Sequence, residues 1–178
     1  MFINQVFREE LEYIASLLFY DSTARKKSIE LNYIQEVFNG LTSQGIYYDT
    51  FLNILYPSSW SLDNPDNLEV HLKENLKVLG IKICMSYDEA LNGVIGFHLK
   101  KIYNGAILPI PGMLALKNTL DWDCSEISNL FSSPSPLLAH VGGLMIDAYL
   151  NDPDEFDLSD LEEDIRQTAQ AWMKLFPG

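Results

Sequence analysis

Residues 86–105, SYDEALNGVIGFHLKKIYNG, carry the pattern that decides the fold class of this chain. Ser86 and Glu89 have capping-box spacing, in which the hydroxyl and the carboxylate satisfy backbone N–H groups at the start of a helix. Apolar residues then recur at helical spacing, and Gly105 is placed to end the helix. The apolar face consists of Leu91, Ile95, His98 and Ile102. The segment therefore predicts an amphipathic helix.

The same helical spacing recurs along the whole chain. In the first helix, Ser16 belongs to the polar side, and in the second, Gly40 is placed to end the helix in a left-handed conformation. Ser135 and Pro136 predict the start of another helix, whereas we expect the proline-containing residues 106–112 to interrupt the pattern. The predicted helices cover residues 7–18, 28–40, 47–55, 66–79, 86–105, 113–120, 125–131, 136–150 and 159–176, the last one opening on a second capping box, Ser159 to Glu162.

Only residues 81–85, Ile-Lys-Ile-Cys-Met, alternate in the manner of a strand, and one short strand cannot make a sheet. No fixed repeat, low-complexity tract or long linker divides the 178 residues. The sequence therefore predicts an all-α fold, a bundle of roughly seven to eight helices with short loops. We expect residues 1–178 to form one helical domain with an acidic segment at residues 119–165.

The chain carries 25 acidic residues against 12 lysines and arginines, a formal charge of −13. Such a charge repels phosphate backbones and anionic lipid, so we expect neither direct nucleic-acid binding nor membrane binding. The N-terminal residues lack the pattern of a signal peptide, and no apolar run is long enough to span a bilayer. We therefore expect a cytoplasmic protein in which Cys84 and Cys124 are reduced thiols.

The negative charge is concentrated in residues 119–165, which contain no lysine or arginine. These residues hold twelve acids, so nearly the whole net charge falls in about a quarter of the chain. The acids are Asp121, Asp123, Glu126, Asp147, Asp152, Asp154, Glu155, Asp157, Asp160, Glu162, Glu163 and Asp164. One interpretation is a solvated acidic face that keeps the protein in solution, with some carboxylates favoured by a helix N-terminus.

Two aromatic residues inside the acidic segment suggest a second interpretation. Trp122 lies between Asp121 and Asp123, and Phe156 lies between Glu155 and Asp157. Aromatic rings surrounded by charge are typical of protein-binding surfaces, although both rings could instead pack into the protein body. The predicted partner-binding residues are Asp121, Trp122, Asp123, Glu126, Asp152, Asp154, Glu155, Phe156 and Asp157.

The sequence contains no pattern that indicates a metal or cofactor site. An EF-hand loop starting at Asp152 fails because Phe156 and Leu158 occupy ligand positions. No zinc-ligand spacing, phosphate-binding loop, dinucleotide fingerprint or nucleophile elbow is present. We therefore predict no cofactor, no metal and no catalytic residue.

Histidines offer the only candidates for catalysis. His98 lies in the apolar stripe of its helix and is interpreted as a core histidine. His140, Gly143, Asp147 and Asn151 form a polar stripe on a helix that is otherwise apolar, which demands a polar partner, water or a pocket. The stripe fits either a structural hydrogen-bond network or a His140–Asp147 pair lining a small cleft.

These patterns leave three hypotheses of function. The first is a small acidic binding module, an inhibitor, antitoxin or immunity-type protein that neutralises a basic partner such as a nuclease by covering its cationic site. The second is a helical hydrolase or small-molecule-binding enzyme that uses His140 and Asp147. The third is a structural or adaptor subunit of a larger assembly. The first accounts for the acidic segment best, and under it the protein is not an enzyme.

Overall fold

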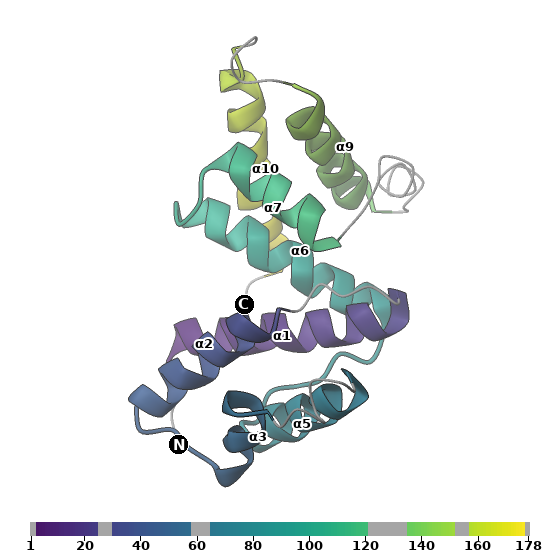
Figure 1. Cartoon of the computed structure of the whole chain (residues 1–178). Helices are drawn as coiled ribbons and strands as arrows, with labels where there is room; N and C mark the ends of the chain where they lie inside the picture. The colour runs from purple at the N-terminus through teal and green to yellow at the C-terminus, as the bar shows by residue number, and fades with distance from the viewer. Residues whose placement is uncertain (1–2, 25–29, 58–64, 121–134, 152–156, 177–178) are drawn as a thin grey trace. The chain divides into compact units, whose positions relative to one another are not determined.

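The structure is a computed structural model that describes residues 3–24, 30–57, 65–120, 135–151 and 157–176 (Figure 1). Within these ranges the regular structure is entirely helical, which confirms the predicted all-α fold. Residues 81–85 connect two helices without forming a strand. The helices are α1 (Gln5–Ala24), α2 (Leu31–Ser43), the 3-10 helix η1 (Asp49–Phe51), α3 (Leu52–Leu55), α5 (Pro65–Val78), α6 (Tyr87–Tyr103), α7 (Pro109–Leu120), α9 (Pro136–Leu150) and α10 (Ser159–Leu175).

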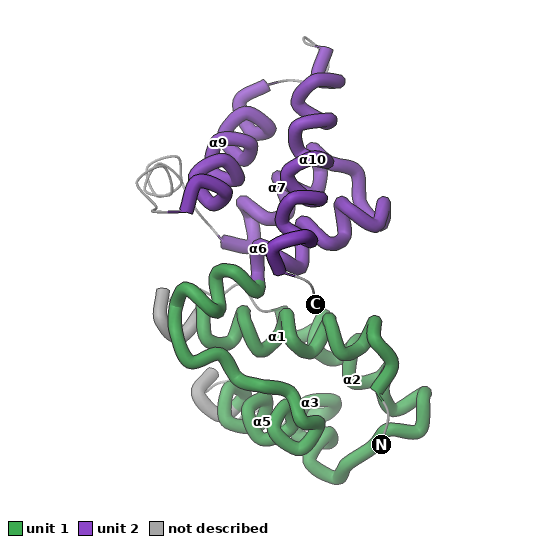
Figure 2. The backbone as a smooth tube through the Cα atoms, turned by 180° about the vertical axis from the view of Figure 1, so that it is seen from behind, with its two compact units in different colours: residues 1–93 green, residues 94–178 purple. Residues whose placement is uncertain are grey.

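The chain divides into two compact units, residues 1–93 and residues 94–178 (Figure 2). Unit 1 contains α1 to α5 and the start of α6, and unit 2 contains the rest of α6 with α7, α9 and α10. The boundary falls inside α6, between Gly93 and Val94. Each unit is described by itself below, and a single domain over residues 1–178 stays a prediction.

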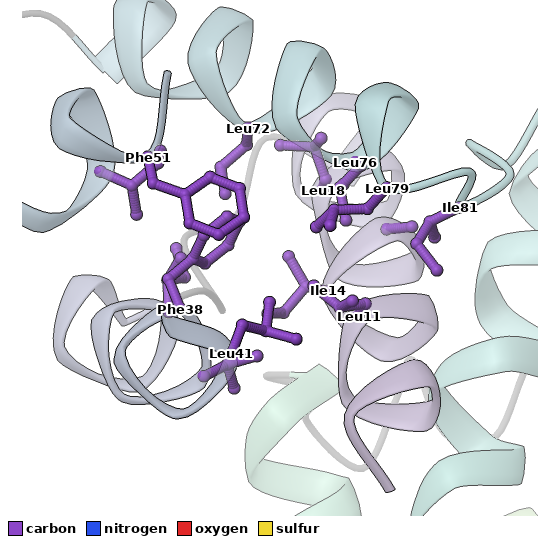
Figure 3. Close-up of a cluster of buried hydrophobic side chains, with 14 of the residues drawn as sticks. Leu11, Ile14, Leu18, Phe38, Leu41, Phe51, Leu72, Leu76, Leu79 and Ile81 are labelled. Atoms are coloured by element: carbon purple, nitrogen blue, oxygen red, sulfur yellow. The ribbon is translucent and has the colours of Figure 1, made fainter. Parts of the chain in front are cut away.

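Unit 1 is built on leucine, isoleucine and phenylalanine side chains from α1, α2, η1 and α5 (Figure 3). The rings of Phe38 and Phe51 meet edge to face, with centroids 4.8 Å apart, at the contact between α2 and η1. Leu72 and Leu76 of α5 are also fully or almost fully buried. These contacts agree with the helical spacing of apolar residues along α1, α2 and α5.

Helix α1 is buried on a second side as well, which the sequence does not predict. Ser16, expected on the polar side, is only 4% exposed, and its hydroxyl donates to the carbonyl oxygen of Glu12 (2.9 Å). The ring of Tyr20, fully buried, stacks on that of Tyr87 at 5.8 Å. The assignment of Ser16 to a solvent-facing side was wrong because residues that follow α5 cover this side of α1.

Gly40 does not end α2, contrary to the prediction. The helix continues to Ser43, and the left-handed residue after it is Gly45, with φ 78°. Gly40 serves packing instead, because the ring of Phe7 occupies the space that a Cβ atom on Gly40 would need. A glycine inside a helix can mark a close contact as well as a helix end.

The prolines of residues 106–112 were expected to break the helical pattern, but they begin a helix. Pro109 is the first residue of α7 and Pro111 lies in its first turn. Neither proline disturbs the helix, because the first backbone N–H groups of a helix have no partner within it. Gly112 then allows Ile102 to approach, whose Cγ1 atom lies 2.6 Å from the position of a Cβ on that glycine.

Candidate protein-binding surface

Most of the predicted partner-binding residues lie outside the described ranges. This applies to Asp121, Trp122, Asp123, Glu126, Asp152, Asp154, Glu155 and Phe156, and also to the helix predicted at residues 125–131. Asp157 is described and exposed. The site can therefore be built only from the part of the acidic segment that belongs to α9 and α10.

Helices α9 and α10 of unit 2 bring described acids from both helices to one end of the unit. The two helices pack against each other, and the last turn of α9 lies at the same end as the first turn of α10 (Figure 1). We call this the acidic end, and define it by Asp147 on α9 and by Asp157, Asp160, Glu163 and Asp164 at the start of α10. All five side chains are exposed.

The start of α10 differs from the predicted capping box. The N-cap residue is Leu158, so Ser159 is the first helical residue and its hydroxyl does not cap the helix. Asp157 takes that role in part, since its carboxylate accepts the backbone N–H of Ser159 at 3.0 Å. This hydrogen bond lowers the pKa of Asp157. Glu162, the expected partner of Ser159, instead accepts a hydrogen bond from Arg166 at 2.9 Å.

Charge pairing leaves most of the acidic end without a cationic partner. Arg166 pairs with Glu162 and lies 3.9 Å from a carboxylate oxygen of Glu163. Among the described residues, no ion pair involves Asp147, Asp160 or Asp164. Asp160 is favoured by the N-terminal dipole of α10, but Asp147 lies near the C-terminal end of α9, where a negative charge is unfavourable. The fold thus maintains a field of unneutralised carboxylates.

The polar stripe of α9 faces solvent. Helix α9 begins as predicted, with the hydroxyl of Ser135 accepting the backbone N–H of Leu138 at 3.4 Å. His140 and Asp147 are both exposed, so water supplies the polar surroundings that the stripe requires. This exposure lends no support to a His140–Asp147 pair in a cleft.

His98, in contrast, is a core histidine as predicted. Its side chain is 8% exposed, and its Nε2 atom lies 3.3 Å from the hydroxyl oxygen of Thr119 on α7. Burial, together with the nearby charge of Lys101, lowers the pKa of His98 to about 4. The imidazole is therefore neutral near pH 7 and packs between α6 and α7.

The acidic end also carries apolar side chains that the sequence analysis missed. Tyr149 and Leu150, in the last turn of α9, are 53% and 65% exposed. The ammonium group of Lys117 on α7 lies over the Tyr149 ring, 4.2 Å from its centroid. The available signal was their position, because only Asn151 separates the two apolar residues from the acidic run that begins at Asp152.

In the part of the chain that the structure describes, no group of three or more histidine, cysteine or acidic side chains is arranged to hold a metal ion. None of the described helices combines the length and apolar character needed to cross a membrane. The chain matches no protein-family model, and neither the curated proteins nor the solved structures include a significant match.

Proposed function

We propose that this chain is a binding module that captures a basic protein through the acidic end of unit 2. The observation that carries the proposal is the meeting of exposed carboxylates from α9 and α10, of which Asp147, Asp160 and Asp164 form no ion pair among the described residues. Exposed Tyr149 and Leu150 add the apolar area that a specific interface needs at its centre.

The position of Asp147 supports a role beyond keeping the protein in solution. A carboxylate near a helix C-terminus lowers the stability of the fold. A neutral polar residue at this position would leave an otherwise acidic protein equally soluble. A cationic partner would relieve this repulsion on binding, and would be steered toward the acidic end at long range. Binding of this kind accelerates association and weakens as salt is added.

Within this class we propose an inhibitor, antitoxin or immunity-type role, in which the acidic end covers the cationic site of an enzyme such as a nuclease. Nucleases present positively charged clefts to the phosphate backbone, and a field of carboxylates competes for the same cleft. The protein would then act by occlusion and would need no catalytic residue or cofactor of its own.

Capture from the cells that produce the protein tests the proposal. The immobilised chain is exposed to lysate at low salt, and retained proteins are eluted with about 0.5 M NaCl, which shortens the screening length severalfold, and identified by mass spectrometry. We expect a basic protein to be retained by the wild type and lost from the double variant Asp160→Lys/Asp164→Lys. If the captured protein cleaves DNA or RNA, adding the chain should inhibit the cleavage.

A matched control separates local binding from net charge. The double variant Glu36→Lys/Asp88→Lys makes the same charge change at two exposed positions in unit 1, and should retain the partner. Equal retention by both double variants, or no basic protein at low salt, would contradict the proposal. Light scattering of the purified chain addresses the adaptor alternative, since a subunit of a larger assembly is expected to self-associate or to bind partners regardless of these charges.

A further inference from the structure

The ring of Tyr149 contacts a cationic side chain of the same protein. The ring lies under the ammonium group of Lys117, 4.2 Å from nitrogen to ring centroid, which is within the range of an energetically significant cation–π contact. The two residues come from different helices, α7 and α9, so the contact is tertiary rather than a consequence of neighbouring positions in one helix. The ring therefore attracts positive charge in the folded protein.

The same ring is accessible to a partner. Tyr149 is 53% exposed although Lys117 lies against it, and Leu150 beside it is 65% exposed. It lies in the last turn of α9, at the acidic end, where the surrounding carboxylates raise the local concentration of cations. At such a place one cationic side chain can make two contacts at once. Its planar group can stack on the exposed ring, and its charge is attracted by the surrounding carboxylates.

We infer that Tyr149 is the platform on which the acidic end binds an arginine side chain of its partner. This inference rests on the proposed function and adds to it the chemistry of the contact. Arginine is favoured over lysine because its guanidinium group is planar, stacks on an aromatic face and is more weakly hydrated than an ammonium group. Lys117 occupies the ring in the free protein, and the partner's arginine either displaces it or stacks on the accessible part of the ring.

Two synthetic peptides serve as probes, each rich in glycine and serine and carrying the same number of arginines or of lysines. Their affinities for the full chain are measured by calorimetry at one low ionic strength. We expect the arginine peptide to bind about fivefold more tightly than the lysine peptide, in line with a partly exposed cation–π contact. In Tyr149→Leu this ratio should fall to about one, whereas Tyr149→Phe, which retains the ring, should preserve it.

Lys117 provides a second test of the same contact. Lys117→Met removes the competing cation, and should raise affinity for the arginine peptide more than Lys174→Met does. The control variant makes the same charge change in the last turn of α10, away from the helix end that carries the acids. Equal effects of the two variants would mean that only net charge matters and would overturn the inference.

The outcomes for this inference and for the proposed function can be told apart. If Asp160→Lys/Asp164→Lys weakens both peptides but Tyr149→Leu leaves the ratio unchanged, the acidic end still binds cations and the arginine platform is wrong. If neither variant changes binding of either peptide, both proposals fail. Circular dichroism of each variant confirms that the comparison is made between folded proteins.

Discussion

The Cβ atom of Ser16 on α1 lies 2.9 Å from the position that a Cβ atom on Gly93 of α6 would occupy. A methyl group at Gly93 would overlap Ser16, whose Cβ is fixed by the backbone of α1 and cannot rotate away. Overpacking of this kind costs about 1 to 3 kcal/mol, and the better helix propensity of alanine offsets about 1 kcal/mol of it. We expect Gly93→Ala to lower the free energy of unfolding by up to about 2 kcal/mol in urea titrations.

A double-mutant cycle identifies the cause. Ser16→Gly opens the space that the new methyl group needs, so the double variant should be more stable than the sum of the two single losses implies. Strict additivity would show that the two positions do not contact each other.

Asn75 is a buried polar residue whose loss we expect to destabilise unit 1. It is fully buried, its Nδ2 atom donates to the carbonyl oxygens of Thr50 (3.2 Å) and His71 (2.8 Å), and its Oδ1 accepts from the Thr50 hydroxyl (2.6 Å). Leucine has the same number and branching of side-chain heavy atoms as asparagine, but Asn75→Leu leaves the partly buried Thr50 hydroxyl and carbonyl groups without this partner. The free energy of unfolding should fall by about 2 to 4 kcal/mol. Asn53→Leu, at an exposed position, should change it by less than about 0.5 kcal/mol in the same measurement.

His98 should make stability depend on pH. The unfolded chain protonates His98 near pH 6.5, whereas the folded protein does so only at about pH 4, so unfolding takes up a proton between these values. Stability is therefore lost as the pH falls through this window, by about 2 kcal/mol between about pH 7.5 and about pH 5. The measurement is the urea midpoint of the wild type and of His98→Gln at both pH values. The variant has no group at position 98 that takes up a proton in this pH range. An equal loss of stability in both proteins would exclude His98 as the cause.

Charge reversal at opposite helix ends should affect stability unequally. Asp147→Lys places a cation in the last turns of α9, where the helix dipole favours it, whereas Asp160→Lys removes a favourable anion from the first turn of α10. Both substitutions reduce the repulsion within the acidic end. The difference in stability between the two variants therefore measures the interaction of each charge with its helix dipole. We expect Asp147→Lys to be more stable than Asp160→Lys by about 1 kcal/mol in thermal or urea unfolding. The reverse order would contradict the placement of the two carboxylates.

The sequence predicted the helices better than it predicted their packing. Periodicity and capping signals gave α6 and α9 nearly to the residue, because these signals depend on neighbours within one turn. The capping box of α6 formed only in part: the Ser86 hydroxyl accepts the Glu89 N–H (3.2 Å), but Glu89 accepts the N–H of Met85 (2.8 Å). The capping box predicted for α10 did not form, because that helix begins one residue earlier than the pattern implies, with Leu158 rather than Ser159 at the N-cap.

For the candidate site, the sequence predicted the acidic character but not the arrangement of the residues. The sequence identified an acidic segment without cations, and the described acids of that segment are exposed, except for Glu162, which is half-buried. The sequence analysis did not identify Tyr149, because an aromatic residue near the end of an apolar helix is usually a core residue. The contact with Lys117, 32 positions earlier in the chain, depends on how α7 packs against α9.

By itself, the sequence determined the helical class of the protein, the starts of several helices and the uneven distribution of charge, since these follow from local spacing and composition. Only the tertiary structure decided that α1 is buried on two sides, that Gly40 accommodates Phe7, and that acids of α9 and α10 meet at one end of unit 2. The reason is physical. A helix forms from interactions within a few residues, whereas the contacts of its faces depend on side chains that only folding brings near.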